Sequence, residues 1–412
     1  MRSRLGVGPP LPHPARGRPA PDPAAPLPRG AVDVVATPDP GPVLLRSWDE
    51  LVGRTPGTDV TQLSAWSRVR RLAGFAPIHL LARRDGELVG GAQILVRRLP
   101  LLGGVGYLPY GPIIAPGVAD RPEIRRALAA ALARLGRRRL RILFVQPPEG
   151  AEDVSADLLE LGFRPSTAGI APPGSLHVDL TEDLATIRGR FGKRLKSWTN
   201  RWESRGVSVR PGDERDLPLL HELMTRSAEQ QGHPVLPYRY VEALYQELAP
   251  THHAAIFVGE VHGAPVVADL VTQCAGMVRG RLGGFDRSGD ASRLSVPAAV
   301  RWQIIQWGKA RGYRWLDFGG LRPATLEALL GGDGPPADGW AGADQPKLTF
   351  GGTAFRYPQA VEMIRPAALR AGYDLAWRSE RGRLLLDSAR TLLRGGRPEG
   401  GRGPAAGGGD HT

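Results

Sequence analysis

The chain repeats one succession of elements at a nearly constant distance, and this repeat limits the folds that it can adopt. Two apolar runs joined by a tight turn span residues 78–98, and a second pair of the same shape spans residues 255–271. The turns contain Asp85-Gly86 and His262-Gly263, and a glycine in a two-residue turn between apolar runs is typical of a β-hairpin. The two glycines are 177 positions apart. The first hairpin therefore has a counterpart about one domain length later.

A helix and a strand follow each hairpin at the same offset. The two helices are predicted from apolar stripes at helical spacing, namely Ile124, Leu128, Leu132 and Leu135 in the first and Val296, Val300, Ile304 and Trp307 in the second. They are expected to end at Gly136 and Gly312, which are 176 positions apart, and to lead into apolar strands over 140–146 and 313–318. Two landmarks at nearly one offset indicate a duplicated α/β domain.

Each half consists of helix, hairpin, helix and strand, followed by a further helix that lies at 154–161 in the first half. This order predicts a mixed β-sheet with helices on its faces. It resembles the N-acetyltransferase (GNAT) fold, used twice, and we predict an α/β (α+β) protein of two tandem GNAT-like domains. The expected boundaries are 43–176 for domain 1, completed by 350–394, and 177–349 for domain 2, with a flexible loop at 321–346. Residues 1–42 and 395–412 are expected to be disordered tails.

The composition of the 412 residues excludes several classes of protein. The apolar fraction of 42% and the charged fraction of 23% are those of a folded protein. The single cysteine, Cys274, cannot form an internal disulfide, and no apolar run approaches the roughly 20 residues that span a bilayer. The formal charge of +13 favours polyanionic partners such as nucleic acid, phosphorylated substrates or anionic lipid. We expect a cytoplasmic protein without a transmembrane segment.

Residues 183–205 contain the most informative helical pattern. Apolar residues recur there at intervals of three and four, which predicts one continuous amphipathic helix: Leu184, Ile187, Phe191, Leu195, Trp198 and Trp202. Basic residues occupy much of the remainder, among them Lys193, Arg194 and Lys196. They form either a solvated face above a core stripe or a platform for the phosphates of an RNA, and the sequence leaves both interpretations open.

Three glycine-rich segments are further candidates for a site. Residues 97–112 follow a predicted strand, and Asp317 precedes two glycines at the end of another, where α/β folds tend to bind ligands. Residues 345–358 set Lys347 beside Gly351-Gly352. Each segment is also consistent with an ordinary turn or surface loop. Lys347 is one of only four lysines among 54 basic residues, which favours it over the arginines as a deprotonatable point charge.

Several catalytic and binding motifs are absent from the sequence. It has no Cys/His cluster with zinc spacing, no GxxxxGK[ST] phosphate loop and no GxSxG nucleophile turn. The [RQ]xxGx[GA] turn with which acetyltransferases bind the coenzyme pyrophosphate is also missing, and DRSGDASRLSVP stands at residues 286–297 instead. A GNAT-like fold without this turn needs another acyl donor. We expect no metal and no bound cofactor.

In order and spacing, these segments resemble the Fem family of aminoacyltransferases. Members share a double GNAT fold and transfer an amino acid from a charged tRNA to the peptide stem of a peptidoglycan precursor. The resemblance covers residues 62–358. It rests on Gln62, Trp66 and Arg70 in TQLSAWSRVRR, on YLPYGP at 107–112, on Lys193-Arg194 before Arg205-Gly206-Val207, on DFGG at 317–320, and on Lys347 with Phe350-Gly351-Gly352.

The resemblance implies roles for particular residues. Arg70 would contact phosphates of the precursor, and the loop that carries Tyr107 and Tyr110 would line the acceptor cleft. Lys347 would lie where the end of the charged tRNA meets the acceptor amine. The remaining substrate-binding residues implied are Lys193, Arg194 and Phe350, together with Arg239, which would replace a family arginine at the position of Gln230.

The chemistry of such a transfer needs no covalent nucleophile. An aminoacyl ester is already activated, so attack by an amine requires positioning, loss of a proton and stabilisation of an oxyanion. Lys347 would stabilise that negative charge or hold the terminal phosphates of the tRNA. Asp317 is the one motif carboxylate considered as a base, and substrate-assisted proton transfer is the alternative.

The sequence therefore predicts an enzyme that transfers an amino acid from aminoacyl-tRNA, its co-substrate, to a lipid-linked or nucleotide-linked peptidoglycan precursor, as in the formation of an interpeptide bridge. A lipid-linked acceptor would place it at the inner face of the membrane as a peripheral protein. Three alternatives stay open. They are an acyl-CoA-dependent N-acyltransferase, an aminoacyl-tRNA-dependent enzyme of natural-product biosynthesis acting on another small amine, and a non-catalytic RNA-binding protein.

Overall fold

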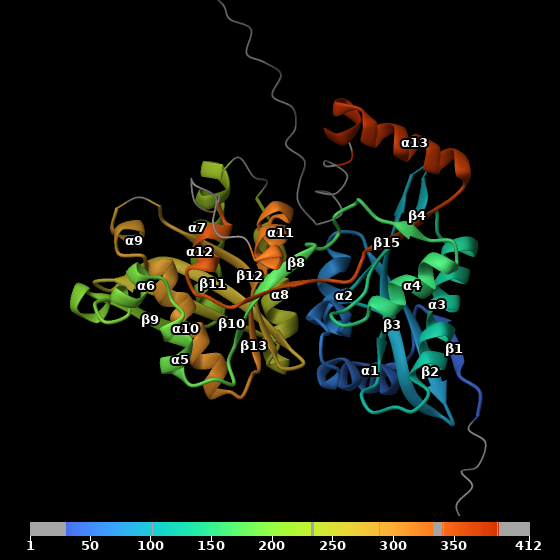
Figure 1. Ribbon diagram of the computed structural model, residues 1–412, viewed down its shortest axis with the longest axis horizontal. Helices are drawn as coiled ribbons and strands as arrows, with labels where there is room; N and C mark the ends of the chain where they lie inside the picture. The colour runs from blue at the N-terminus through green and yellow to red at the C-terminus, as the bar shows by residue number, and fades with distance from the viewer. Residues whose placement is uncertain are drawn as a thin grey trace, which may run out of the picture.

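The structure is a computed structural model that describes residues 30–386 except 101, 232–234, 288, 333–339, 341 and 385. Two domains lie side by side, each built on one β-sheet (Figure 1). Sheet 1 has the order β1 (Asp33–Thr37), β2 (Ala76–Arg84), β3 (Glu87–Leu99), β4 (Gly103–Pro109), β6 (Ile142–Gln146), β15 (Val361–Ile364) and β7 (Arg164–Pro165), and β5 (Ile113–Ile114) also pairs with β3. Sheet 2 has the order β14 (Thr353–Arg356), β8 (Gly174–Asp179), β13 (Trp315–Gly320), β12 (Met277–Phe285), β11 (Ala264–Cys274), β10 (Ala254–Val261) and β9 (Val207–Gly212).

Helices cover the faces of both sheets. Domain 1 contains α1 (Pro42–Arg54), the short 3-10 helix η1 (Val60–Gln62), α2 (Ser64–Arg71), α3 (Arg121–Arg138), α4 (Glu152–Glu160) and α13 (Ala367–Arg378). Domain 2 contains α5 (Leu184–Gly189), α6 (Lys193–Trp198), η2 (Glu203–Arg205), α7 (Leu217–Gln231), α8 (Tyr238–Leu248), α9 (Asp290–Arg293), α10 (Val296–Ala310), α11 (Pro323–Gly331) and α12 (Asp344–Leu348). The predicted apolar stripes of α3 and α10 face the sheets, since Leu128 and Val300 are fully buried.

The predicted duplication is confirmed. The β2–β3 turn holds Asp85 and Gly86 at φ of 52° and 85°, and the β10–β11 turn holds His262 and Gly263 at 51° and 81°. Two consecutive positive φ angles give the turn the twist that an antiparallel pair of strands requires. The helix and strand predicted after each hairpin are α3 with β6 in domain 1 and α10 with β13 in domain 2. The fold is a mixed α/β architecture of two tandem GNAT-like domains.

The expectation of one continuous helix over residues 183–205 is wrong. The segment contains α5, α6 and η2, and it is interrupted between Gly189 and Gly192. Glycine inside a helix costs about 1 kcal/mol relative to alanine, so these two positions favour a break. The apolar stripe itself is buried as expected, because Ile187, Phe191 and Leu195 belong to the core of domain 2.

Three further boundaries differ from the expectation. Residues 321–346 are not a loop throughout, because α11 and the start of α12 lie within them and Leu326 is fully buried against sheet 2. Strand β1 lies inside the expected N-terminal tail, where it pairs with β2. Strand β14 belongs to sheet 2, so only the chain from β15 onward completes domain 1. Residues 1–29 and the expected tail at 395–412 lie outside the described residues.

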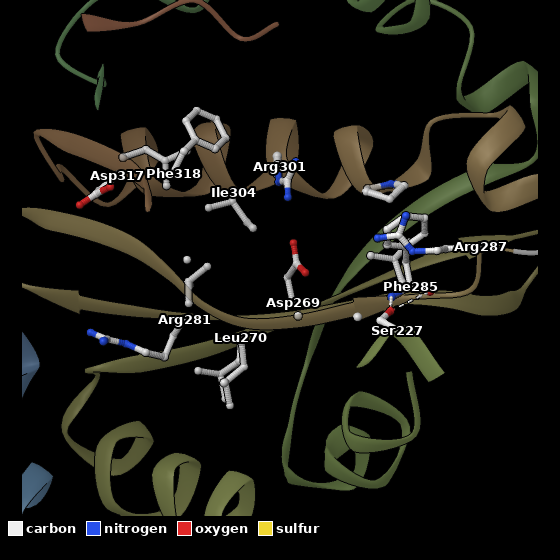
Figure 2. Close-up of a pocket in the computed structure, with 18 residues that line it drawn as sticks. Ser227, Asp269, Leu270, Arg281, Phe285, Arg287, Arg301, Ile304, Asp317 and Phe318 are labelled. Carbon is white, nitrogen blue, oxygen red and sulfur yellow. Dashed lines mark hydrogen bonds between the residues drawn. The ribbon is translucent and has the colours of Figure 1, made fainter. Parts of the chain in front are cut away.

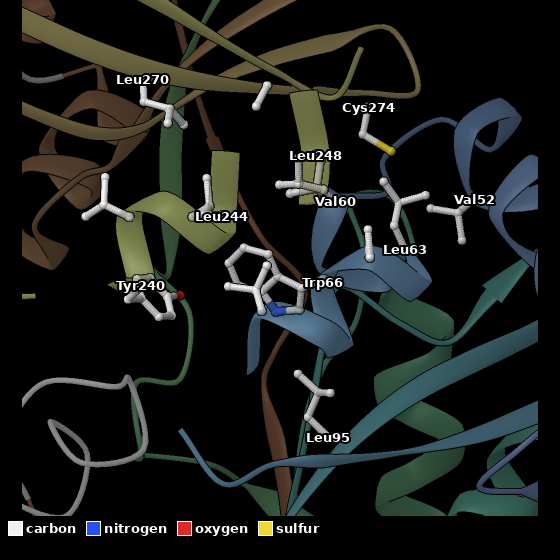
Figure 3. Close-up of a cluster of buried hydrophobic side chains, with 14 of the residues drawn as sticks. Val52, Val60, Leu63, Trp66, Leu95, Tyr240, Leu244, Leu248, Leu270 and Cys274 are labelled. Atoms are coloured by element: carbon white, nitrogen blue, oxygen red, sulfur yellow. The ribbon is translucent and has the colours of Figure 1, made fainter. Parts of the chain in front are cut away.

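One hydrophobic cluster joins the two domains (Figure 3). From domain 1 it contains side chains such as Leu63 and Trp66, and from domain 2 it contains Leu244, Leu248 and Leu270. Each of these side chains is at most 5% exposed. Burying a large apolar side chain contributes about 1.5–3 kcal/mol, so a continuous cluster of this kind fixes the domains against each other. It also brings η1 and α2 close to the strands of sheet 2.

Candidate active site

A buried group of two arginines and two aspartates lies where the domains meet. We call it the interdomain ion cluster, and it consists of Asp59 before η1, Arg279 and Arg281 on β12, and Asp317 on β13. Arg279 bridges both carboxylates, with Nη1 2.6 Å from Asp59 Oδ2 and Nε 2.8 Å from Asp317 Oδ2. Arg281 Nη2 lies 2.9 Å from Asp59 Oδ2. Buried charges need such partners, so the cluster ties domain 1 to the parallel strands of domain 2.

The Asp317 carboxylate has several other donors. The Gly319 amide lies 2.7 Å from Oδ1, the Tyr357 hydroxyl lies 3.3 Å from Oδ2, and the Ser175 hydroxyl also donates to Oδ1. Burial by itself would raise the pKa of Asp317, but Arg279, His177 and Ser175 hold that pKa well below its usual range. A carboxylate with such a low pKa is a weak base. Its geometry favours a role in positioning Arg279.

A cavity of about 380 Å³ on domain 1 brings together Arg70, Tyr107 and Tyr110, the predicted acceptor residues. Tyr240 of α8 and Arg281 of β12 close it from domain 2. Arg70 is only 3% exposed, and its guanidinium carbon lies 4.7 Å from the centre of the Phe75 ring. Burial raises the pKa of both tyrosines, so their hydroxyls stay protonated and can donate. We call this space the domain 1 cavity.

The domain 1 cavity continues as an apolar space beneath α13. That space has a volume of about 420 Å³ and shares Val105, Phe144, Ala168 and Ile170 with the domain 1 cavity. Its outer wall is formed by α13 through Leu369, Gly372, Tyr373 and Trp377. The two spaces lie on the same face of β4 and β6. We call the second one the apolar extension.

A separate cavity of about 280 Å³ lies in domain 2 between β11, β12 and α10 (Figure 2). Strands β12 and β13 pair at three positions only, and the last pair is Arg279 with Asp317. Beyond it the floor consists of Gly280 and Gly283, where a β-carbon at Gly280 would meet nothing within 4 Å. The wall from α10 includes Pro297 in its first turn and Arg301. We call this space the domain 2 cavity.

Arg281 borders both cavities. Its guanidinium carbon lies 5.2 Å from the centre of the Trp66 ring in the domain 1 cavity. Figure 2 shows the Arg281 side chain on the side of the sheet opposite Ile304, which faces the domain 2 cavity. The two cavities therefore lie on opposite sides of sheet 2 and meet at the end of the β12–β13 pairing.

A match to a known family model exists in domain 2. The model is described as an acetyltransferase (GNAT) domain, and it matches residues 189–332. Over both domains, a crystal structure of FemX aligns with a TM-score of 0.67 at 16% identity, covering 80% of this chain and 98% of FemX. The chain has the tandem GNAT fold that FemX also has. The C-terminal domain of a putative lysylphosphatidylglycerol synthetase from Agrobacterium fabrum aligns with a TM-score of 0.50 at 13% identity, covering 86% of this chain and 98% of that domain.

Sequence relatives carry a more specific name. Lipid II:glycine glycyltransferase of Staphylococcus saprophyticus is 24% identical over 234 residues, which are 54% of this chain and 56% of that protein. The protein of the same name from Staphylococcus aureus strain MRSA252 is 24% identical over 222 residues, 51% of this chain and 52% of that protein. The chain thus spans about half the length of the curated relatives that it matches.

Lys347 lies beside the site but lines neither cavity. It belongs to α12, not to a loop as expected, and Nζ donates to the carbonyl oxygen of Gly320 at 2.5 Å, just after Asp317 on β13. Burial lowers the pKa of Lys347, and the nearby Arg301 lowers it further. Lys347 is therefore a half-buried ammonium at the end of the strand that carries Asp317.

The other predicted substrate-binding residues are placed differently. Phe350 is 1% exposed and packs in the domain 2 core, with its ring centre 4.9 Å from that of Phe318 and 5.2 Å from that of Phe191. Lys193 and Arg194 are exposed on α6, and Arg239 is exposed on α8 next to Tyr240. Among the described residues, these four do not border the domain 1 or the domain 2 cavity.

The sequence analysis missed most of the interdomain ion cluster. A signal was present in RGRLGGF, where Arg279 and Arg281 interrupt an otherwise apolar and glycine-rich strand. Charged residues are rarely buried without partners, so two arginines within a central strand indicate acidic partners elsewhere in the chain. Nothing in the local sequence identifies Asp59 as that partner, because it lies 220 positions away from Arg279.

Metal-binding groups and membrane-spanning helices are both missing from the described residues. Within 30–386, apart from the undescribed positions in that range, no three His, Cys, Asp or Glu side chains are grouped to hold a metal ion. In the same part of the chain, no helix has the length and apolar character needed to cross a membrane.

Proposed function

We propose that this protein is an aminoacyltransferase that moves an amino acid from aminoacyl-tRNA to an amine on the peptide stem of a peptidoglycan precursor. The observation that carries the proposal is the pair of cavities that meet at Arg281, one on each side of sheet 2. Such an arrangement suits direct transfer between two bound substrates. The name of the staphylococcal relatives supports glycine as the first amino acid to test and lipid II as the first acceptor.

The domain 2 cavity is the proposed donor site. Arg287 and Arg301 border it, and so does Pro297 in the first turn of α10, at the positive end of the dipole of that helix. This environment suits the terminal phosphates of a tRNA acceptor end. The missing coenzyme turn at 286–297 argues against acetyl-CoA as the donor.

The domain 1 cavity is the proposed acceptor site. Arg70 supplies a buried cation for phosphate, and the protonated tyrosines supply hydrogen-bond donors for the peptide stem. The apolar extension supports a lipid-linked precursor over a nucleotide-linked one, because hydrocarbon gains about 0.8 kcal/mol for each CH₂ group that it buries. In this proposal the headgroup occupies the domain 1 cavity and the start of the lipid chain lies under α13.

The reaction follows from this placement. The acceptor nitrogen bonds to the ester carbonyl carbon, the ester C–O bond to the tRNA ribose breaks, and the proton lost by the amine ends on the leaving ribose oxygen. Lys347 lines neither cavity, so we propose that its ammonium leaves the Gly320 carbonyl oxygen when the donor binds and stabilises the negative charge on the ester carbonyl oxygen. Asp317 holds Arg279 in place, and the proton moves with help from the substrate instead of from Asp317.

A donor comparison tests the proposal. Purified protein is incubated with lipid II and with its nucleotide-linked counterpart, using tRNAs charged with labelled amino acids, and with labelled acetyl-CoA and a longer acyl-CoA in parallel. We expect label to move from charged tRNA to the precursor, and not from either acyl-CoA. Transfer from acyl-CoA would instead establish the N-acyltransferase alternative, and tRNA binding without any transfer would establish an RNA-binding protein.

The acceptor class is tested with Gly372→Phe. A β-carbon at Gly372 would meet nothing within 4 Å, so a phenyl ring can enter the apolar extension without a clash. We expect kcat/KM for lipid II to fall about tenfold, the equivalent of two buried CH₂ groups, with little change for the nucleotide-linked precursor. Ala371→Phe is the matched control, because Ala371 is exposed on the same helix and does not border the extension. Equal loss for both acceptors would contradict the assignment of the lipid chain.

A further inference from the structure

Asp269 is a carboxylate that has no part in the transfer reaction proposed for the two cavities. It lies on β11 directly opposite Gly283 of β12. Its side chain borders the domain 2 cavity and points toward α10 (Figure 2). A β-carbon on Gly283 would collide with Asp269 Oδ1, so the glycine makes room for the carboxylate over the strand. The local sequence therefore presents an acidic group to the cavity.

The surroundings of Asp269, which is half-buried, differ from those of the buried Asp59 and Asp317. Asp59 and Asp317 are each bound by arginine, whereas no residue that the structure describes forms a hydrogen bond or ion pair with the Asp269 carboxylate. Burial raises the pKa of Asp269, and the charge of Arg301 acts against that rise. Figure 2 shows Arg301 on α10 directed toward Asp269 from across the cavity. The cavity thus presents one negative and one positive group that face each other without touching.

This arrangement selects a particular kind of ligand. A half-buried carboxylate without a partner gains from a cation that reaches it, and an arginine across the cavity can donate to acceptor oxygens. The charged end of an aminoacyl-tRNA offers both within a few bonds: a primary ammonium on the α-carbon, and the ester and phosphate oxygens beyond it. An acyl-CoA offers no ammonium at its thioester.

We propose that Asp269 binds the α-ammonium group of the aminoacyl donor, while Arg301 binds oxygens of the same acceptor end. This assignment rests on the proposed function and extends it by naming the residue that distinguishes an aminoacyl donor from a simple acyl donor. Asp269 is a binding residue here, and it takes no part in the proton transfer. Holding the donor ammonium also fixes the ester carbonyl relative to β12, where the acceptor arrives from the other side.

The experiment combines a change in the donor with a change in the protein. Glycyl-tRNA and N-acetylglycyl-tRNA, in which the ammonium is replaced by a neutral amide, are compared as donors for the wild type and for Asp269→Asn. A hydrogen-bonded ion pair is worth about tenfold to a hundredfold in affinity, so the wild type is expected to prefer glycyl-tRNA by about that factor. In Asp269→Asn the preference is expected to fall to within about threefold, mainly through weaker use of glycyl-tRNA.

Asp286→Asn is the matched control. Asp286 adjoins Phe285 and Arg287, which border the cavity, but it pairs with Arg226 at 3.7 Å and does not border the cavity itself. The preference of Asp286→Asn for glycyl-tRNA over N-acetylglycyl-tRNA is expected to equal that of the wild type. Binding of glycyl-tRNA, N-acetylglycyl-tRNA and uncharged tRNA is measured alongside, and uncharged tRNA should bind the wild type and Asp269→Asn equally.

The outcomes separate this inference from the proposed function. Transfer by the wild type with no preference between the two donors, or a preference that survives in Asp269→Asn, would overturn the role of Asp269 and leave the aminoacyltransferase proposal intact. Absence of transfer and of tRNA binding in the wild type would overturn the proposed function, and with it the inference. Loss of the preference in Asp269→Asn alone supports both.

Discussion

The two domains share a hairpin, a helix and a parallel strand pair, but they differ in how far that pair runs. In domain 1, β4 and β6 pair at five consecutive positions, from Val105 with Ile142 to Pro109 with Gln146. The Gly111 amide then donates to the Gln146 carbonyl oxygen at 3.1 Å, which extends the contact. In domain 2, β12 and β13 pair at three positions and stop at Arg279 with Asp317. The two domains therefore share one scaffold, but the parallel strands separate earlier in domain 2 than in domain 1.

The consequence is that the two cavities differ in kind. The closed pair of domain 1 leaves a cavity on the face of its sheet, where β4 and β6 form the floor through Tyr107 and Phe144. The open pair of domain 2 leaves a cavity beside the point where its strands separate. The interdomain ion cluster lies at that point, so the pairing stops where charged side chains from both domains meet. Substitutions at four places in the molecule test this difference, and the effects that we expect of them decrease from the first to the last.

Removing Arg279 is expected to have the largest effect, because it leaves Asp59 and Asp317 buried without their shared partner. Breaking a buried ion pair from one side costs about 3–5 kcal/mol, so Arg279→Ala should lower the free energy of unfolding by that amount at pH 7–8. Denaturant unfolding measures it. Arg215→Ala is the control, because Arg215 pairs with Asp213 in solvent and should change stability little.

The pH dependence of the same variant gives an independent check. In the wild type the pKa values of Asp59 and Asp317 are lowered, so the stability that they contribute is present above about pH 4, the ordinary carboxyl range, and is lost only as the pH falls through the folded-state values. Without Arg279, burial favours the protonated carboxyls. The stability difference between wild type and Arg279→Ala should therefore shrink as the pH is lowered from 8 toward 4. A constant difference would contradict the buried ion pair as its cause.

The contrast between the two cavities also explains which features could be predicted from the sequence. Local patterns predicted the elements, because hairpin turns such as Asp85-Gly86 and the apolar stripe of α10 are set by nearby residues. The resemblance pointed to Tyr107 and Tyr110, which border the domain 1 cavity, although Tyr107 lies on β4 and not in the loop expected over residues 97–112. The domain 2 cavity was not predicted. It depends on where two strands 38 residues apart stop pairing, which no local pattern encodes.

Phe350 and Asp317 show that a sequence resemblance does not by itself reveal the role of a residue. Both lie in segments on which the resemblance to the Fem family rests, yet Phe350 is a core side chain and Asp317 accepts from donors in three other segments of the chain. A sequence match indicates that a position is constrained, but packing, ion pairing and catalysis constrain a residue equally. Only the surroundings tell them apart.

Lys347→Ala is expected to lower turnover about a hundredfold, because removing one electrostatic contact to a developing oxyanion typically costs that much. Its melting temperature should stay within a few degrees, since the lost hydrogen bond to Gly320 is worth about 1 kcal/mol. Lys347→Arg should rescue a phosphate contact but not a tight oxyanion contact. Lys309→Ala is the control, because its ammonium also donates to backbone carbonyls, those of Leu180 and Thr181. Wild-type turnover in Lys347→Ala would exclude a catalytic role.

Gly280→Phe places a ring in the domain 2 cavity, where β12 and β13 separate. In domain 1 the corresponding strands, β4 and β6, stay paired. The ring has space to enter, and misplacing a donor by about 1 Å can cost up to a hundredfold, so we expect the KM for charged tRNA to rise about tenfold or more. Steady-state kinetics with each substrate varied in turn will measure this. The KM for the acceptor should change little, and a rise in that KM instead would reverse the assignment of the two cavities. Gly53→Phe is the control, because Gly53 also faces open space but lies on α1 of domain 1.

The smallest expected effect is on the salt dependence of tRNA binding. Its measurement tests whether only domain 2 contacts the donor. Lys193 and Lys196 are exposed on α6, so reversing both charges should leave the fold intact. Each lost phosphate contact reduces the slope of log K against log salt by about 0.7–0.9, and the double variant should lose about 1.5. Filter binding between low and moderate salt measures the slope. Arg138→Glu with Arg139→Glu, exposed at the end of α3 in domain 1, is the matched control and should keep the wild-type slope. An equal fall in both double variants would mean that the charge of the whole protein, and not α6, attracts the tRNA.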